Sequence, residues 1–398
     1  MASFSVRFLG CKVSHSDAQA LRERLVADGH EERSNGAEVA VVNTCCVTHE
    51  AVSKSRQAAS RAARSHRRVY VTGCGANLGG DAMAGLPENV VVIARPSEEV
   101  AETVARDVGA IGCVQADARL DRVRAFVKVQ DGCSFNCNFC VIPLVRGPSR
   151  SRRADAVLAE IRKRVGQGHR EVVLTGINLG CYRDREAGFA LARLVREAGG
   201  VSGLERLRLS SIEINHVNDE VIRALRETPV AGRHLHVPLQ SGDDGVLRAM
   251  GRRYTAATYL RRLDGLDEFN VTADVIVGFP GEDERAFERT LDVVRQARIT
   301  KVHVFPYSPR PGTVTADADT VPAHVKKERS ARLRALSADA CLARWRTKVG
   351  REDRVLVDRP GRGYGDDYSP WLVDSAARVG RLVPVRGRAV VEEGIVAA

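Results

Sequence analysis

Short apolar runs alternate with amphipathic stretches through the first 107 residues. The pattern predicts strands at Ser5–Leu9, Glu38–Val42, Arg68–Thr72 and Val90–Ile93, separated by helices at Asp17–Asp28, Glu50–Arg64 and Ser97–Asp107. In the first helix the apolar residues Ala18, Leu21 and Leu25 recur at helical spacing. Strand–helix alternation with short connections predicts a parallel α/β sheet.

The alternation loosens around residues 108–121 and then restarts. Six further strands are predicted, at Val123–Val129, Glu171–Leu174, Arg206–Leu209, His234–Val237, Val271–Val277 and Lys301–Phe305. Helices are predicted between them at Ala154–Val165, Phe189–Ala198, Asn218–Arg226, Ala256–Leu266 and Glu284–Arg298. Six strand–helix repeats are fewer than the eight of a closed barrel. They predict an open, partial (β/α)6 barrel whose chemistry lies at the carboxyl ends of its strands.

The remaining residues change character twice. Residues 313–350 are helical and basic, which predicts a segment that packs back on the barrel. After it come short β-rich pieces at Arg354–Val357, Pro370–Val373, Arg381–Val385 and Arg388–Val391, with the glycine-rich turn 361–365 among them. These predict a small β-barrel. The predicted domains are therefore 1–117, 118–348 and 349–398.

Length and composition agree with this division. A chain of 398 residues with 44% hydrophobic and 28% charged residues is typical of a globular protein with two or three domains. No apolar run has transmembrane length, and the first residues lack a signal-peptide layout, so we expect a cytoplasmic protein without a membrane partner. The net charge of +11 is compatible with a polyanionic partner such as RNA but does not establish one.

The most informative residues are the thiols of one short loop. Cys133, Cys137 and Cys140 have the spacing C-x3-C-x2-C, directly after the first barrel strand. Ten cysteines in a reducing compartment indicate metal or redox chemistry more than a disulfide framework. Three thiolates on one loop suit zinc or an iron–sulfur cluster. Because structural zinc sites usually have four protein ligands, three ligands favour a centre with an open position.

A second trio follows three consecutive strands of the first domain. Cys11, Cys45 and Cys74 each come after a predicted strand, and parallel strands end at the same edge of a sheet. They therefore predict a second three-thiolate site, although a buried cysteine often serves only as a small apolar residue. Cys46 should point away from this site. Cys113, Cys181 and Cys341 have no partner pattern and are expected to be core or surface residues.

Polar and glycine residues follow the other barrel strands. Together they would line one rim, where a small molecule could bind. The rim residues singled out are Thr175, Gly176, Ser211, Glu213, Gln240 and Gly278.

A basic stretch follows Cys45. Its cations are Lys54, Arg56, Arg61, Arg64, Arg67 and Arg68. Such a run is typical of a solvated helix face, and the alternative is a surface that faces RNA.

The cysteine loop resembles the signature of the radical S-adenosylmethionine superfamily, C-x3-C-x-φ-C, in which Phe139 is the aromatic residue φ and is expected beside the cofactor. The whole chain resembles the methylthiotransferase family. The matching stretches are Leu9–Val13, Asn43–Cys45 with Val47, Thr72–Cys74, Gln130–Cys133, Cys140–Pro143, Arg146–Pro148 and Arg150–Arg152. Leu207–Glu213, His234–Gly242 and His303–Ser308 are most similar to the branch that acts on N6-threonylcarbamoyladenosine at position 37 of tRNA.

The resemblance implies a function. It implies two 4Fe–4S clusters, one held by Cys133, Cys137 and Cys140 that cleaves S-adenosylmethionine, and one held by Cys11, Cys45 and Cys74 that carries the sulfur. A 5′-deoxyadenosyl radical would remove hydrogen from C2 of the adenine in the anticodon loop, and a second S-adenosylmethionine would methylate the sulfur. An electron donor and a sulfur source are also implied, and the last domain would be similar to TRAM domains.

Three alternatives remain open from the sequence. Sister branches of the family modify isopentenyl-adenosine in tRNA or an aspartate of a ribosomal protein. A protein of another class, a non-catalytic RNA-binding protein with zinc or iron–sulfur sites, would also use two groups of thiols.

Overall fold

The computed structural model describes residues 2–94, 97–108 and 123–398. Its N-terminal unit is a parallel sheet with strand order β2-β1-β3-β4-β5. The strands are β1 (Ser3–Phe8), β2 (Glu31–Glu32), β3 (Val39–Thr44), β4 (Arg68–Gly73) and β5 (Val90–Val92). The helices are α1 (Lys12–Ala27), α2 (His49–Ala63), α3 (Cys74–Asn77) and α4 (Ser97–Val108).

The alternation of side chains along β3 explains the layers of this unit. Val39 and Val41 pack with α1 and α4, while Ala40 and Val42 pack on the other face with α2 and α3. Successive side chains of a strand point to opposite faces, so a strand that is apolar throughout is buried between two helical layers.

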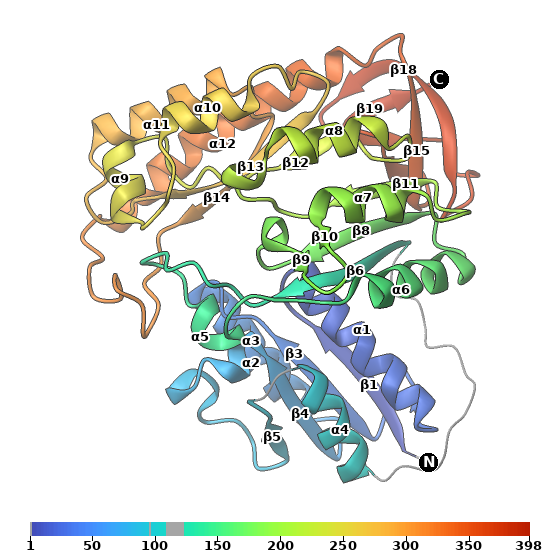
Figure 1. The fold of residues 1–398 in the computed structure, drawn as a ribbon. Coiled ribbons are helices and arrows are strands. Elements are labelled where there is room, and N and C mark those ends of the chain that lie inside the picture. The colour runs from blue at the N-terminus through green and yellow to red at the C-terminus, as the bar shows by residue number, and fades with distance from the viewer. Residues whose placement is uncertain (1, 95–96, 109–122) are drawn as a thin grey trace.

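The central unit is an open barrel of six parallel strands in sequence order, as predicted (Figure 1). The strands are β6 (Arg124–Asp131), β8 (Glu171–Gly176), β11 (Arg206–Leu209), β12 (His234–His236), β13 (Asn270–Val277) and β14 (Lys301–Pro306). Single bridges such as Ser211 to His236 join the two halves, β11-β8-β6-β7 and β12-β13-β14, in which β7 (Arg150–Ser151) is a short strand antiparallel to β6. The helices are α6 (Ala154–Gly166), α7 (Leu191–Gly199), α8 (Asp219–Glu227), α9 (Asp244–Ala249), α10 (Ala256–Leu263), α11 (Glu284–Gln296) and α12 (Ala323–Arg346).

The inner face of these strands is polar. Val127 and Val172 face the helices in the main apolar core, whereas Glu171 on the other face is fully buried and pairs with Arg124 (3.3 Å) and Arg208 (3.0 Å). These cations outweigh burial, which alone would raise the carboxyl pKa, and hold the pKa of Glu171 below its usual range. The barrel interior is therefore charged and suited to a polar ligand.

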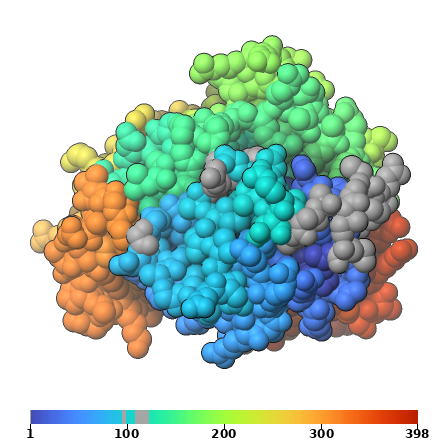
Figure 2. Space-filling view, turned by 90° about the horizontal axis from the view of Figure 1, so that it is seen from below, coloured from blue at the N-terminus to red at the C-terminus, as the bar shows by residue number. Residues whose placement is uncertain are grey.

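Helix α1 lies against the open side of the barrel (Figure 1). The ring of His15 meets Phe126 of β6 edge to face, with 5.1 Å between centroids. Figure 2 views the molecule from the side of the N-terminal unit and shows that unit packed beneath the barrel, with the C-terminal residues at one flank.

The C-terminal unit is a closed five-stranded barrel, as predicted, with order β15-β16-β17-β19-β18. Its strands are β15 (Glu352–Arg359), β16 (Arg362–Tyr364), β17 (Pro370–Leu372), β18 (Leu382–Val391) and β19 (Gly394–Ala397). Asp367 joins it to the rest of the protein, because its carboxylate pairs with Arg344 and Lys348 at 3.0 Å each. Its carbonyl also accepts from the Asn270 side chain at the start of β13.

Several element boundaries differ from the prediction. Helix α1 begins at Lys12 and not at Asp17, and the basic helix α12 begins only at Ala323. The predicted turn 361–365 contains strand β16, and β18 is one strand where two were predicted. Gly387 of β18 lies at a register shift and against the Lys348 carbonyl, where a side chain would clash. The strand therefore needs this glycine and continues through it, although the sequence suggested that the strand ends there. The predicted boundary at 117–118 lies outside the described residues.

In the part of the chain that the structure describes, no helix combines the length and the apolar character needed to cross a membrane.

Candidate functional site

The first candidate centre is the loop that follows β6. Gly132 has φ +67° and lies so close to the backbone of Gly147 and Pro148 that a Cβ would clash with their carbonyl oxygens. The Cys133 amide donates to the Gly147 carbonyl at 3.1 Å, and the Gln130 side chain donates to the Gly132 carbonyl at 2.7 Å. The glycine lets the chain turn sharply here, and these bonds fix where the first thiol is placed.

The three thiols of this loop have different neighbours. The Cys133 sulfur accepts from the Phe135 amide at 3.4 Å, and the Cys137 sulfur accepts from the Arg252 guanidinium at 3.4 Å. Burial, together with negative charge on Cys137 and Cys133, raises the pKa of the Cys140 thiol to about 11. The thiols are thus close enough to repel one another as thiolates, so a bound cation would stabilise all three.

The second candidate centre lies at the carboxyl edge of the N-terminal sheet. Cys11 is the residue before α1, Cys45 directly follows β3, and Cys74 begins α3 after β4. The strand ends are level, since Thr44 pairs with Gly73. The Cys45 pKa is raised by burial and by negative charge on Cys74 and Cys11. The sheet thus brings together three thiols spread over sixty-four positions.

Cys46 does not point away from this centre, and that prediction is wrong. Its buried thiol packs beside Cys74 and Val145 and hydrogen-bonds to the Cys74 sulfur. This bond and the positive charge of Arg146 outweigh burial and lower the pKa of Cys74 to about 7. Cys74 is therefore the thiol of this trio held nearest to its thiolate form.

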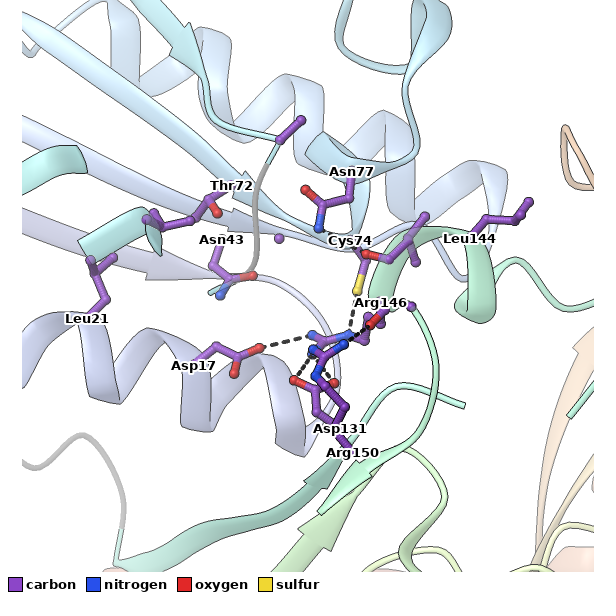
Figure 3. Close-up of a pocket in the computed structure, with 15 residues that line it drawn as sticks. Asp17, Leu21, Asn43, Thr72, Cys74, Asn77, Asp131, Leu144, Arg146 and Arg150 are labelled. Carbon is purple, nitrogen blue, oxygen red and sulfur yellow. Dashed lines mark hydrogen bonds and ion pairs between the residues drawn. The ribbon is translucent and has the colours of Figure 1, made fainter. Parts of the chain in front are cut away.

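A buried ionic network extends from Cys74 to Asp131, the last residue of β6 before the first thiol loop (Figure 3). The Arg146 guanidinium donates to the Cys74 sulfur, to Asp131 and to Asp17, each at 3.0 Å. Lys128 pairs with the same two carboxylates, at 2.6 Å to Asp17 and 3.0 Å to Asp131. Asp17 belongs to α1 of the N-terminal unit, whereas the other three charged groups belong to the barrel. The network therefore fixes the second thiol trio relative to the loop of the first.

Both trios suit a cluster better than a single ion. Among residues 2–94, 97–108 and 123–398, no three His, Cys, Asp or Glu side chains converge on one point as ligands of one metal ion would. A 4Fe–4S cluster binds each thiolate through a different iron, so its ligands are spaced more widely. The candidate donors are thiols alone, the ligand set of such clusters, and three thiolates would leave one iron of a four-iron cluster without a protein ligand.

The predicted cofactor-binding residues divide into Glu213 and Phe139, which lie at the first thiol loop, and the others, which have contacts with other parts of the barrel. Glu213 pairs with Arg252 at 3.5 Å and so lies near Cys137, and the ring of Phe139 packs on Phe279. Gly278, in contrast, gives its amide to Glu282 at 2.7 Å and packs against the Lys326 chain. Thr175 is buried at the end of β8 and Gly176 packs against Gln130; Ser211 and Gln240 form isolated strand bridges.

Arg252, Arg146 and Asn178 were missed as site residues. Arg252 and Arg146 contact thiols across 115 and 72 sequence positions, and the Asn178 amide lies 3.9 Å from the Cys133 sulfur. Only one of the three had a sign in the sequence: Arg146 lies within a stretch that matches the family.

Cys181 and Cys341 were not expected to belong to either trio. The Cys181 sulfur is 3.4 Å from His216, and burial and the negative charge of the nearby Cys133 raise the pKa of Cys181. The Cys341 thiol donates to the Thr300 carbonyl. Cys113 lies outside the described residues.

Two family models match the chain. Residues 127–294 match the Radical SAM superfamily, and residues 3–94 match the uncharacterized protein family UPF0004.

Curated relatives match along nearly the whole chain. The threonylcarbamoyladenosine tRNA methylthiotransferase MtaB of Thermotoga maritima is 33% identical and aligns over 100% of this chain and 96% of its own. The protein of the same name from Bacillus subtilis is 37% identical over 85% and 80% of the two chains. The tRNA-2-methylthio-N(6)-dimethylallyladenosine synthase of Nocardia farcinica is 36% identical over 96% and 83%.

Solved structures share the fold. The radical S-adenosylmethionine methyltransferase TsrM from Kitasatospora setae superposes with a TM-score of 0.59 at 15% identity, over 79% of this chain and 75% of that one. The cobalamin-dependent S-adenosylmethionine radical enzyme OxsB gives 0.53 at 9% identity, over 84% and 55%.

Proposed function

Since the chain belongs to the radical S-adenosylmethionine methylthiotransferase family, we propose that it adds a methylthio group to C2 of N6-threonylcarbamoyladenosine at position 37 of tRNA. The observation that carries this proposal is the pairing of two thiol trios, one per unit, across the network of Arg146. A radical enzyme without sulfur chemistry needs only the first trio. Two thiol centres in neighbouring, tightly docked units suit a reaction in which two reagents meet.

We assign Cys133, Cys137 and Cys140 to a cluster that also binds S-adenosylmethionine, and Cys11, Cys45 and Cys74 to a cluster that carries sulfur. The two clusters and S-adenosylmethionine supply radical formation and sulfur transfer, chemistry that acid–base side chains cannot perform at an unactivated carbon. The chain itself positions the thiols, keeps water out and provides compensating charge.

The cations beside the thiols have a distinct role in this scheme. Arg252 faces Cys137, and Arg146 faces Cys74. Hydrogen bonds to ligand sulfurs and nearby positive charge favour the more negative, reduced form of an iron–sulfur cluster. Each arginine therefore supports the reduced state of one cluster. The electrons and the replacement sulfur come from a separate electron donor and a separate sulfur source.

Helix α2 supplies a surface for tRNA. Lys54, Arg67 and Arg68 are paired with Glu50, Glu38 and Asp107, but Arg56, Arg61 and Arg64 line an open groove and form no ion pair with a described residue. Unpaired arginines at a groove suit the phosphates of an RNA backbone. The cytoplasm, where tRNA is modified, is the expected location.

Dimethylallyladenosine in tRNA is the second candidate substrate. Relatives named as synthases of its methylthio derivative are 34–36% identical to this chain, so sequence identity alone does not separate the two substrates. Which of the two nucleosides is the substrate depends on the residues that surround the N6 substituent.

Mass spectrometry of tRNA nucleosides from a strain that lacks the gene tests the proposal. We expect the methylthio derivative of N6-threonylcarbamoyladenosine to disappear. N6-threonylcarbamoyladenosine without the methylthio group should accumulate. Loss of the dimethylallyl derivative instead would assign the second substrate. The anaerobically purified protein should contain about eight iron atoms and absorb visible light. Two zinc ions in a colourless protein would refute the cluster assignments.

A further inference from the structure

A cavity of about 790 Å³ lies between the barrel strands, α12 and the C-terminal barrel. Its walls come from β12, β13 and β14, from α12, and from the segment Tyr364–Pro370. One further lining residue, Lys12, comes from the N-terminal unit and is the neighbour of Cys11. The cavity therefore extends from the C-terminal barrel to the first residue of α1, which is next to Cys11 in the sequence. Its volume is in the range of cavities that hold small-molecule ligands.

The lining is rich in positive charge. The cations are Lys12, Lys301, Arg334 and Arg346, against two carboxylates, Glu392 and Glu393, and three histidines add further donors: His234, His236 and His303. Among the described residues, none of the four cationic side chains forms a hydrogen bond or an ion pair. Lys301, Arg334 and Arg346 are exposed, where unpaired cations are ordinary, whereas Lys12 is half-buried and would be stabilised most by an anionic ligand.

Lys12 is the innermost of these cations. It is half-buried at the first turn of α1; burial and the positive charges of Arg124 and Arg208 lower its pKa, and negative charge on Cys11 and Asp274 opposes this lowering. A carboxylate placed here would relieve the repulsion among the three cations. Lys12 can donate three hydrogen bonds, and none of them goes to a described side chain.

The histidines beside Lys12 are held in place by neighbours. The Thr272 hydroxyl lies 3.0 Å from His234 Nε2 and 2.9 Å from His236 Nδ1, and His236 Nε2 lies 3.3 Å from Asp274. The ring of His303 lies 5.5 Å from that of His236 and forms no hydrogen bond with a described residue. His303 therefore remains available to a ligand that Lys12 holds.

We infer that this cavity binds the carboxylate-bearing N6 substituent of the adenosine substrate, with Lys12 as its counter-ion and His303 as a further polar contact. The inference rests on the proposed tRNA function and explains its choice of substrate. A threonylcarbamoyl group has a carboxylate and a hydroxyl, whereas a dimethylallyl group is a hydrocarbon. A hydrocarbon would bury Lys12 without a partner, and sites built for polar groups reject analogues that lack them.

Binding of three anticodon stem-loops tests the inference. They differ only at position 37, which is N6-threonylcarbamoyladenosine, unmodified adenosine or N6-dimethylallyladenosine, and fluorescence anisotropy gives the Kd for the reconstituted full-length protein. Lys12→Met should weaken binding of the threonylcarbamoyl RNA by about tenfold to a hundredfold and leave the unmodified RNA unchanged. Lys12→Arg should retain most of the preference. The matched control is Lys163→Met, which removes an exposed cation on α6 and should change neither affinity.

Other outcomes would overturn the inference. Equal weakening of all three RNAs by Lys12→Met would make Lys12 a phosphate contact. Loss of about four irons from this variant would assign Lys12 to the neighbouring cluster. If folded Lys12→Met preferred the threonylcarbamoyl RNA as strongly as wild type does, the cavity would not bind the N6 substituent through Lys12. If the wild-type enzyme methylthiolates only the dimethylallyl RNA, the proposed substrate fails. The wild-type enzyme could methylthiolate the threonylcarbamoyl RNA while Lys12→Met still binds that RNA more tightly than the other two. In that case the proposed substrate stands and only the cavity assignment fails.

Discussion

Replacing Asp367 by asparagine should loosen the C-terminal barrel from the rest of the protein. The carboxylate is buried between Lys348 and Arg344, both at 3.0 Å. Burial alone would raise the pKa of Asp367, but these two cations outweigh it and lower the pKa from 3.8 to about 2. At about 1.4 kcal/mol per pH unit, the ionised carboxylate stabilises the folded protein by roughly 2 to 3 kcal/mol at neutral pH.

The sign of the pH dependence follows from the lowered pKa. The stabilisation is present above pH 4, where the unfolded carboxyl is also ionised, and is lost as pH falls toward 2. Wild type and Asp367→Asn should therefore differ at pH 7, and the difference should shrink below pH 4.

Tryptophan fluorescence reports on this unit and on the end of α12 that packs against it. The chain has two tryptophans: Trp371 belongs to the apolar cluster of the C-terminal barrel, and Trp345 of α12 packs against that cluster. Urea titration of the iron-free protein should show a lower unfolding midpoint for Asp367→Asn and an unchanged one for Asp374→Asn, a control that replaces an exposed carboxylate of the same barrel. Equal midpoints for Asp367→Asn and wild type at pH 7 would show that the ionised carboxylate adds no net stability.

Further variants test the sites. Arg146→Met removes the shared partner of Asp17 and Asp131 and should lower the free energy of unfolding by about 3 to 5 kcal/mol, measured by thermal unfolding; an unchanged melting temperature would contradict the network. Cys137→Ala should abolish cleavage of S-adenosylmethionine, whereas Cys45→Ala should still release 5′-deoxyadenosine but form no methylthio product, both followed by liquid chromatography with mass spectrometry. Full methylthiolation by Cys45→Ala would refute the two-centre scheme. Gly132→Ala places a Cβ against backbone carbonyls at positive φ and should cost about 1 to 3 kcal/mol and lower the iron content; normal iron loading would contradict this role of the glycine.

Periodicity was sufficient to predict the order of the main strands and helices and the position of Cys11, Cys45 and Cys74 at one edge of the sheet. Parallel strands have their carboxyl ends at one edge, so thiols at those ends lie at that edge whatever the details of packing. The end of a helix or a strand was less predictable. Helix α1 begins at Lys12 although its first turn contains no regular apolar stripe, because its polar residues face the barrel and not solvent.

Contacts between units could not be predicted from periodicity. Arg146 reaches Cys74 and Asp17 only because two separately folded units dock on each other, and no local pattern reports which faces will meet. Cys46 was misplaced for the same reason, since its thiol packs in an apolar cluster with Val145 of α5 (Ile142–Arg146), an element of the other unit. The cavity around Lys12 likewise has walls from all three units.

Helix α1 begins beside a thiol, turns a lysine into the cavity and places Asp17 in the buried network, all within two turns. Each residue of an α-helix is rotated by about 100° from the one before. One inserted or deleted residue between Cys11 and Asp17 would therefore turn Lys12 or Asp17 away from its present neighbours. Changes of substrate in this family should arise by substitution at fixed length in this segment, and an engineer who wishes to alter substrate choice should keep its seven-residue span.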